Sequence, residues 1–144
     1  MIKINTRTFF YSRKVLYLLD KKTHGVLRRF GQYVRTTAKR SIRPVGKGGK
    51  PSTPDQPPKS RKGLLKNFIF YAFDLTKRSV VIGPQKLAMK GKTPNVLEYG
   101  GTVKSKSKKG HITSSKVSAR PYMGPAFEKS KKRLNALWSN SVLK

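Results

Sequence analysis

Few side chains in this sequence are capable of acid–base or metal chemistry. The chain has five carboxylates, two imidazoles and no thiol: Asp20, Asp55, Asp74, Glu98, Glu128, His24 and His111. Metal-assisted phosphate chemistry needs two or three carboxylates in one place, and a histidine metal site or Ser-His-acid triad needs a full set of partners. The spacing of the acids pairs none of them, and neither histidine has such a set nearby in sequence. We therefore expect no catalytic, metal or cofactor site and no enzymatic activity.

Glu98 has the most unusual surroundings of the five acids, because it stands between an apolar and an aromatic residue in LEYGGTV, residues 97–103. In so basic a chain, a carboxylate flanked in this way is kept charged by a nearby cation or by backbone amides. We expect Arg120 to be the partner. Gly100 and Gly101 let the backbone turn or pass close to another segment. We therefore predict that Glu98 is a structural anchor where the sheet meets the C-terminal helix.

The charge of the chain indicates its class of partner. Lys and Arg number 34 against 5 Asp and Glu, a formal net charge of +29 over 144 residues. Such a surplus attracts nucleic acid, anionic surfaces or acidic proteins. The charge is spread evenly, +16 over residues 1–72 and +13 over residues 73–144, so we place it on the outside of one folded domain. With no cysteine, signal peptide or membrane span, we expect an intracellular, soluble protein.

The hydrophobic pattern predicts the elements that position these residues. Apolar residues recur at steps of three or four from Val15 to Ile42, which predicts one long helix over about residues 11–42, while Gly25 weakens it and leaves a break near residues 23–25 as the alternative. The chain then turns at Arg43-Pro44. The opposite helix face is basic and either contacts solvent alone or binds a polyanion; its cations are Arg28, Arg29, Arg35, Lys39 and Arg40.

Beyond this helix, the sequence predicts an α+β fold in which the N-terminal helix and a C-terminal helix pack on a small antiparallel β-sheet with extended loops. Residues 63–73 and 78–84 predict a hairpin, and a further loop is expected over 85–95. The first strand is apolar on both faces, including Phe68 and Phe70, so helices or another subunit should cover both. The C-terminal helix is expected to begin near Pro125.

Two basic loops are the candidate contacts for a polyanion. One is rich in Pro and Gly and spans residues 43–63; the other spans residues 104–116 and is expected to project as a hairpin loop. Their candidate contact residues are Lys47, Lys50, Arg61, Lys62, Lys104, Lys106, Lys108 and Lys109. These residues would bind either DNA phosphates or an acidic protein. Composition alone also allows a small RNA- or DNA-binding protein of ribosomal or nucleoid type.

Six segments in order resemble the head-to-tail connector, or tail-completion (neck), proteins of long-tailed bacteriophages, also described as minor tail or virion morphogenesis proteins. They are AKRSIRP, PSTPDQPP, KGLLKNFIFYAF, RSVVIGPQKL, LEYGGTV and ARPYMGPAFEK, which together cover about residues 30–140.

This resemblance implies a structural virion protein without catalysis. It would form a ring of six or twelve copies in the neck between the head-closure connector and the tail-terminator or tail-tube proteins. It would assemble in the host cytoplasm, contact no membrane and in one reading hold the end of the genomic DNA. The expected structural and interface residues are Glu98, Tyr99, Gly100, Gly101, Arg120, Pro121, Tyr122, Phe68 and Phe70.

Overall fold

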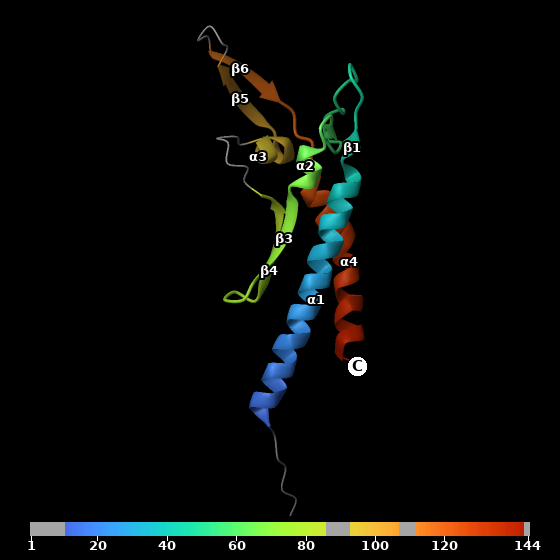
Figure 1. Ribbon diagram of the computed structural model, residues 1–144, viewed down its shortest axis with the longest axis vertical. Coiled ribbons are helices and arrows are strands. Elements are labelled where there is room, and N and C mark those ends of the chain that lie inside the picture. The colour runs from blue at the N-terminus through green and yellow to red at the C-terminus, as the bar shows by residue number, and fades with distance from the viewer. Residues whose placement is uncertain (1–10, 86–92, 107–111, 143–144) are drawn as a thin grey trace, which may run out of the picture.

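A single long helix, α1 (Ser12–Ser41), forms the spine of the molecule in the computed structural model, which describes residues 11–85, 93–106 and 112–142. The predicted helix of about residues 11–42 is confirmed, and it continues unbroken through Gly25. It ends where Ile42 becomes extended, two residues before Pro44. Figure 1 shows the second long helix, α4 (Met123–Val142), running antiparallel to α1 along one of its sides.

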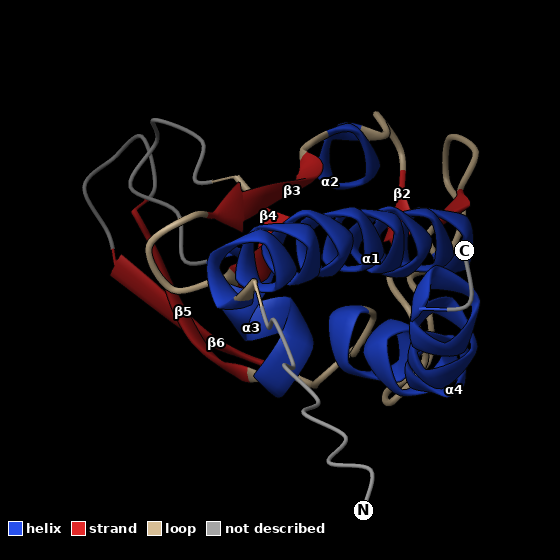
Figure 2. Ribbon diagram, turned by 90° about the horizontal axis from the view of Figure 1, so that it is seen from below, coloured by secondary structure: helices blue, strands red, loops and turns tan. Residues whose placement is uncertain are grey.

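The strands form three separate two-stranded ribbons. β1 (Arg43–Pro44) pairs in parallel with β2 (Lys59–Ser60); β3 (Ile69–Asp74) pairs antiparallel with β4 (Ser79–Pro84), and β5 (Gly101–Lys106) with β6 (Ile112–Val117). Helices α2 (Leu64–Asn67) and α3 (Thr93–Tyr99) are short. As Figure 2 shows, α1 lies between the β3–β4 ribbon and α4. The predicted α+β class is confirmed.

Three local predictions were wrong. Residues 64–67 form α2 rather than the start of a strand, because Gly63 adopts a left-handed conformation (φ 67°) that begins a short helical turn. The loop expected over 85–95 is interrupted by α3 from Thr93, and its residues 86–92 lie outside the described ranges. Helix α4 begins at Met123, so Pro125 is its third residue rather than its first.

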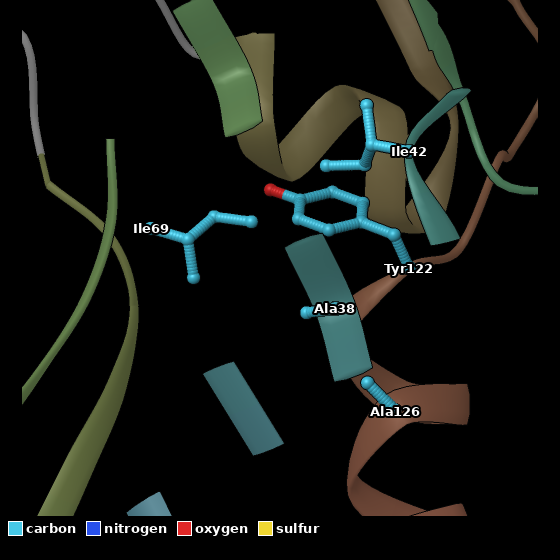
Figure 3. Close-up of a cluster of buried hydrophobic side chains, with 5 residues drawn as sticks. All are labelled: Ala38, Ile42, Ile69, Tyr122 and Ala126. Carbon is cyan, nitrogen blue, oxygen red and sulfur yellow. The ribbon is translucent and has the colours of Figure 1, made fainter. Parts of the chain in front are cut away.

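The two long helices and the β3–β4 ribbon share a narrow core. Val26, Phe30, Val34 and Ala38 recur at every fourth position of α1 and are all buried. Phe30 meets the ring of Phe127 on α4 edge to face at 5.9 Å between centroids. Figure 3 shows the upper part of this core, where Ala38, Ile42, Ile69 and Ala126 surround the ring of Tyr122.

Gly31 marks the crossing of α1 and the β3–β4 ribbon. A Cβ atom there would lie 2.8 Å from Val80 Cγ2 and 3.1 Å from Tyr71 Cδ2, whereas a Cβ at Gly25 would meet nothing within 4 Å. Alanine is favoured over glycine in a helix by about 1 kcal/mol. We therefore expect Gly25→Ala to stabilise the fold by about that amount, while overpacking makes Gly31→Ala destabilising by about 1 to 2 kcal/mol net. Urea unfolding of both variants checks this pair, and a stabilised Gly31→Ala would contradict the close packing.

The Pro/Gly-rich loop of residues 43–63 is folded back on its own chain. Besides the β1–β2 pairing, Asp55 donates its backbone amide to Ala119 O at 2.9 Å, with Asp55 itself at a positive φ of 62°. Ser52 and Pro58 are buried within the loop. These contacts join the loop to the segment that precedes α4.

Candidate functional site

Glu98 caps the first turn of α4 from a distant part of the chain. It lies near the end of α3, and its carboxylate accepts three backbone hydrogen bonds: Tyr122 N and Met123 N donate to Oε2 at 3.0 Å, and Gly124 N donates to Oε1 at 2.7 Å. The first amides of a helix have no partner inside it and carry the positive end of its dipole. A carboxylate at this place satisfies both the hydrogen bonds and the charge. We call this arrangement the Glu98 cap.

The expected pairing of Glu98 with Arg120 was wrong, and the alternative of backbone amides is what the structure has. Arg120 Nε instead donates to Ser52 O at 3.0 Å, and the Arg120 amide donates to Leu97 O at 2.6 Å. Because Pro121 has no amide hydrogen, the amides presented to Glu98 begin at Tyr122. Arg120 thus joins the 43–63 loop and α3 to the segment that enters α4.

Gly100 and Gly124 allow close approaches at the Glu98 cap, the first between two backbone segments and the second between the backbone and the Glu98 carboxylate. Gly100 has a φ of 76°, and a Cβ there would lie 3.1 Å from Ala119 N and 3.2 Å from Val117 O. A Cβ at Gly124 would lie 3.2 Å from Glu98 Oε1. Gly101 follows with a φ of 147°, also in the region that favours glycine. Tyr99, by contrast, is 81% exposed and available to a partner.

Tyr122 links the Glu98 cap to the core. Its side chain is 1% exposed, and its ring points toward Ile69 in Figure 3. Burial, with a smaller contribution from the negative charge of Glu98, raises the pKa of the Tyr122 phenol to about 12. The neutral phenol is therefore the form that the folded state favours.

This shift predicts a specific loss of stability in alkali. An unfolded tyrosine ionises near pH 10, so the contribution of Tyr122 is complete below pH 10 and is lost as the pH rises from about 10 to about 12. We expect a loss of roughly 1.4 kcal/mol for each pH unit in this window. Urea unfolding of the protein and of Tyr122→Phe at pH 8, 10 and 11 checks it. The same alkaline slope in both proteins would rule Tyr122 out as the source.

Of the two apolar faces predicted for the β3 region, one is buried against the core and the other is partly exposed. Ile69 faces the core, whereas Phe70 is 44% exposed on the opposite face, where Ala72 and Val81 are also exposed. The cations Arg35 and Lys39 lie near the Phe70 ring, with the Arg35 Cζ and Lys39 Nζ 5.8 Å and 5.9 Å from its centroid. Desolvation, followed by the charges of Arg35 and Lys66, lowers the pKa of Lys39. Phe68, just before β3, is half-buried.

Five of the eight cations predicted to meet a polyanion are exposed. Lys47, Lys50, Arg61 and Lys62 are exposed on the 43–63 loop. Lys104 is exposed on β5 and Lys106 is the last residue of that strand, while Lys108 and Lys109 lie outside the described residues. The expected projecting loop of residues 104–116 consists, in its described part, of the strands β5 and β6 themselves.

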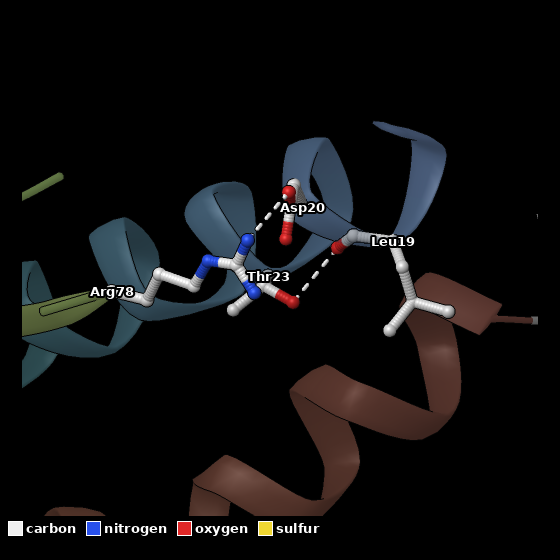
Figure 4. A network of polar contacts seen from close by, with 4 residues as sticks. All are labelled: Leu19, Asp20, Thr23 and Arg78. Atoms are coloured by element: carbon white, nitrogen blue, oxygen red, sulfur yellow. Dashed lines mark hydrogen bonds and ion pairs between the residues drawn. The ribbon is translucent and has the colours of Figure 1, made fainter. Parts of the chain in front are cut away.

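Asp20, Asp74 and His24 have contacts that are structural. Figure 4 shows Asp20 Oδ2 on α1 pairing with Arg78 Nη2 beside the β3–β4 turn at 3.2 Å, an exposed pair of small energetic value. Asp74 Oδ1 accepts the amides of Thr76 and Lys77 within that turn. His24 packs edge to face against Phe73 at 4.3 Å; His111 lies outside the described residues. Within the described ranges, no three acidic or histidine side chains come together as metal ligands would.

Sequence reasoning missed one surface, at the N-terminal end of α1. We call residues Val15, Leu16, Tyr17, Leu18 and Leu19 the apolar tip: all five are exposed, Tyr17 by 67%, Leu16 by 62% and Leu19 by 57%. In Figure 1 these first turns of α1 extend past the end of α4. Five consecutive apolar residues leave no polar side on the helix, and a helix of that kind is normally buried. The unbroken apolar run, in place of a one-sided stripe, was the signal.

Comparison with known proteins does not indicate a function for this chain. No protein-family model matches the chain, and neither a curated protein nor a solved structure shows significant similarity to it. None of the described helices is both long enough and apolar enough to cross a membrane.

Proposed function

We propose that this protein is a structural, non-enzymatic subunit that self-associates into a ring in the neck of a tailed bacteriophage virion, between the head connector and the tail. The observation that carries the proposal is the apolar tip of α1, whose five large side chains are exposed in the isolated subunit. A soluble monomer rarely exposes so concentrated an apolar surface unless it is a contact site. The resemblance in segment order supports the choice of the neck among possible assemblies.

The β5–β6 ribbon is a second surface that favours assembly. Thr102, Val103 and Lys104 on β5 and residues 112–116 on β6 are all exposed, so both faces of the ribbon are open. An isolated two-stranded hairpin is only marginally stable in water. Packing against a neighbouring subunit, or adding a strand to its open edge, would stabilise it. A ring gives every subunit such a neighbour.

The net charge of +29 on each subunit would allow the ring to bind the adjacent rings of the virion. Adjacent connector and tail-terminator or tail-tube rings with acidic faces would dock onto the exposed cations of the 43–63 loop by electrostatic complementarity. The end of the genomic DNA is the other polyanion that a neck subunit meets. A ring of six or twelve subunits is what the resemblance to neck proteins implies.

Native mass spectrometry and negative-stain imaging of the purified protein test the proposal. We expect closed rings of six or twelve subunits, and a larger complex when connector or tail components are added. Monomers that bind neither the connector nor the tail components would contradict the proposal. The ribosomal or nucleoid alternative would be favoured by two results together: the protein is a monomer that binds isolated nucleic acid tightly, and its loss leaves virion assembly intact.

A further inference from the structure

A groove with a volume of about 890 Å³ lies between α1 and α4. One wall is formed by residues of α1 at helical spacing, from Arg29 through Tyr33 and Thr37 to Arg40; the other is formed by Lys129, Ser130 and Arg133 of α4. The hydroxyls of Ser130 and Thr37 lie 3.4 Å apart across the floor. Because Ser130 is buried, this contact joins the two helices beneath the groove.

The rim of the groove carries four cations and no acid. Arg29, Arg40, Lys129 and Arg133 all line the groove and all are exposed, and none of the other lining residues is acidic. The guanidinium of Arg133 lies 4.9 Å from the centroid of the Tyr33 ring, which holds it in place. Arg29 and Arg40 are eleven residues apart, so they span about 16 Å along α1. Measured along the axis of a B-form duplex, that distance corresponds to about five base-pair steps.

The polar groups of the groove are suited to phosphate oxygens. Arginine presents a planar fork of donors that matches phosphate geometry, and three of the four cations are arginines. Tyr33 and Thr36 also line the groove, and their hydroxyls can donate hydrogen bonds to phosphate. An exposed aromatic ring beside arginine is a further feature of nucleic-acid grooves. A flat membrane surface would not enter a concave groove of this kind.

We propose that the groove between α1 and α4 binds the phosphate backbone of nucleic acid. Nucleic acid would then contact this basic protein mainly on the two long helices rather than on the basic loops. The inference does not depend on ring formation, because every groove residue belongs to one subunit. It therefore stands or fails separately from the proposed role in a virion.

Two matched triple variants test this location. One variant carries Arg29→Gln, Arg40→Gln and Lys129→Gln in the groove; the control carries Lys50→Gln, Arg61→Gln and Lys62→Gln on the 43–63 loop. Both lose the same charge at exposed positions, and circular dichroism would verify that both fold. Fluorescence anisotropy then measures binding to a labelled 20-nucleotide single-stranded DNA, a 20-base-pair duplex and a single-stranded RNA of the same length, between 50 and 300 mM NaCl.

We expect the groove variant to bind at least about 30-fold more weakly at 0.1 M salt, and its dependence of log K on log salt to be shallower by about two to three. The loop control should change affinity less than about threefold. The three oligonucleotides show which form of nucleic acid the groove prefers. Equal weakening by the two variants would overturn the proposal. So would polyglutamate that displaces the oligonucleotides at equal concentrations of charge, since the groove would then suit acidic protein.

A chemical footprint gives a readout that does not depend on removing charge. The chain contains no cysteine, so a Gln32→Cys variant carries one thiol in the groove and Gln56→Cys carries one on the 43–63 loop; both positions are exposed. We expect saturating oligonucleotide to slow maleimide labelling at position 32 by at least about tenfold, while labelling at position 56 stays unchanged. Protection at position 56 alone, or at neither position, would overturn the groove as the binding site.

Discussion

Replacing Leu16 and Leu19 together with glutamine is expected to leave the subunit folded and to abolish its self-association. The two side chains lie three residues apart on the same face of the apolar tip and are exposed in the isolated subunit. Their loss therefore removes no contact from the core. Burial of one leucine in an interface contributes about 1.5 to 3 kcal/mol. Two leucines per contact then correspond to a loss of more than about 100-fold in the association constant.

The control is a variant of the same tip that changes only its charged residues. Lys14→Gln with Lys21→Gln introduces the same new side chains at exposed positions of the same helix. Sedimentation velocity and native mass spectrometry of the two variants, with thermal unfolding of each, separate assembly from folding. The leucine variant should sediment as a monomer with an unchanged melting temperature, and the lysine variant should retain the assembly. Rings that persist in the leucine variant would show that subunits meet through another surface.

Glu98→Gln is expected to produce the largest loss of stability among conservative changes in this chain. Glutamine keeps one carbonyl oxygen but turns an amide group toward the N–H groups of α4, and it removes the negative charge from the helix N-terminus. Hydrogen bonds to a charged group contribute about 1.5 to 3 kcal/mol each. We expect a loss of about 2 to 4 kcal/mol, a large part of the 5 to 15 kcal/mol typical of a domain.

Glu128→Gln provides the matched control for this change. Glu128 lies on α4, the helix that Glu98 caps. It is exposed, and its replacement removes one negative charge, as the Glu98 change does. Urea unfolding at neutral pH should show a change within about 0.5 kcal/mol for Glu128→Gln, as is usual for surface substitutions. If the two variants were equally stable, the Glu98 cap would contribute nothing beyond general electrostatics. No change in any chemical rate is expected in either variant.

The parts of the fold that depend on local rules could be predicted from the sequence. The end of α1 follows from Arg43-Pro44, and the β3–β4 pairing follows from two β-rich runs joined by a short turn. The start of β3 could not be placed, because Leu64 and Leu65 suit a strand and a helical turn equally well, and the left-handed Gly63 decided between them. Propensity has little weight in a four-residue segment.

Contacts between distant segments were the harder part of the candidate site. The sequence indicated that Glu98 needs either a cation or backbone amides, but the choice depended on where α4 begins, and Pro125 suggested a start two residues too late. The groove between α1 and α4 also could not be predicted from the sequence. Arg29 and Arg40 were recognised as part of one basic face, yet Lys129 and Arg133 joined them only through the antiparallel packing of α1 and α4. Pairwise placement of helices is not encoded in either helix alone.

The Glu98 cap also closes the base of the β5–β6 ribbon. Leu97 O and the Glu98 carboxylate hold residues 120–124, so the ribbon leaves and rejoins the body of the subunit at one fixed point. Lengthening the two strands together would extend the ribbon without moving α3 or α4, because closing a longer loop costs only about 0.6 kcal/mol for each doubling. The reach of this appendage is therefore free to vary among related chains, while the short segments on either side of it are constrained. Natural variation in length should collect between residues 101 and 117.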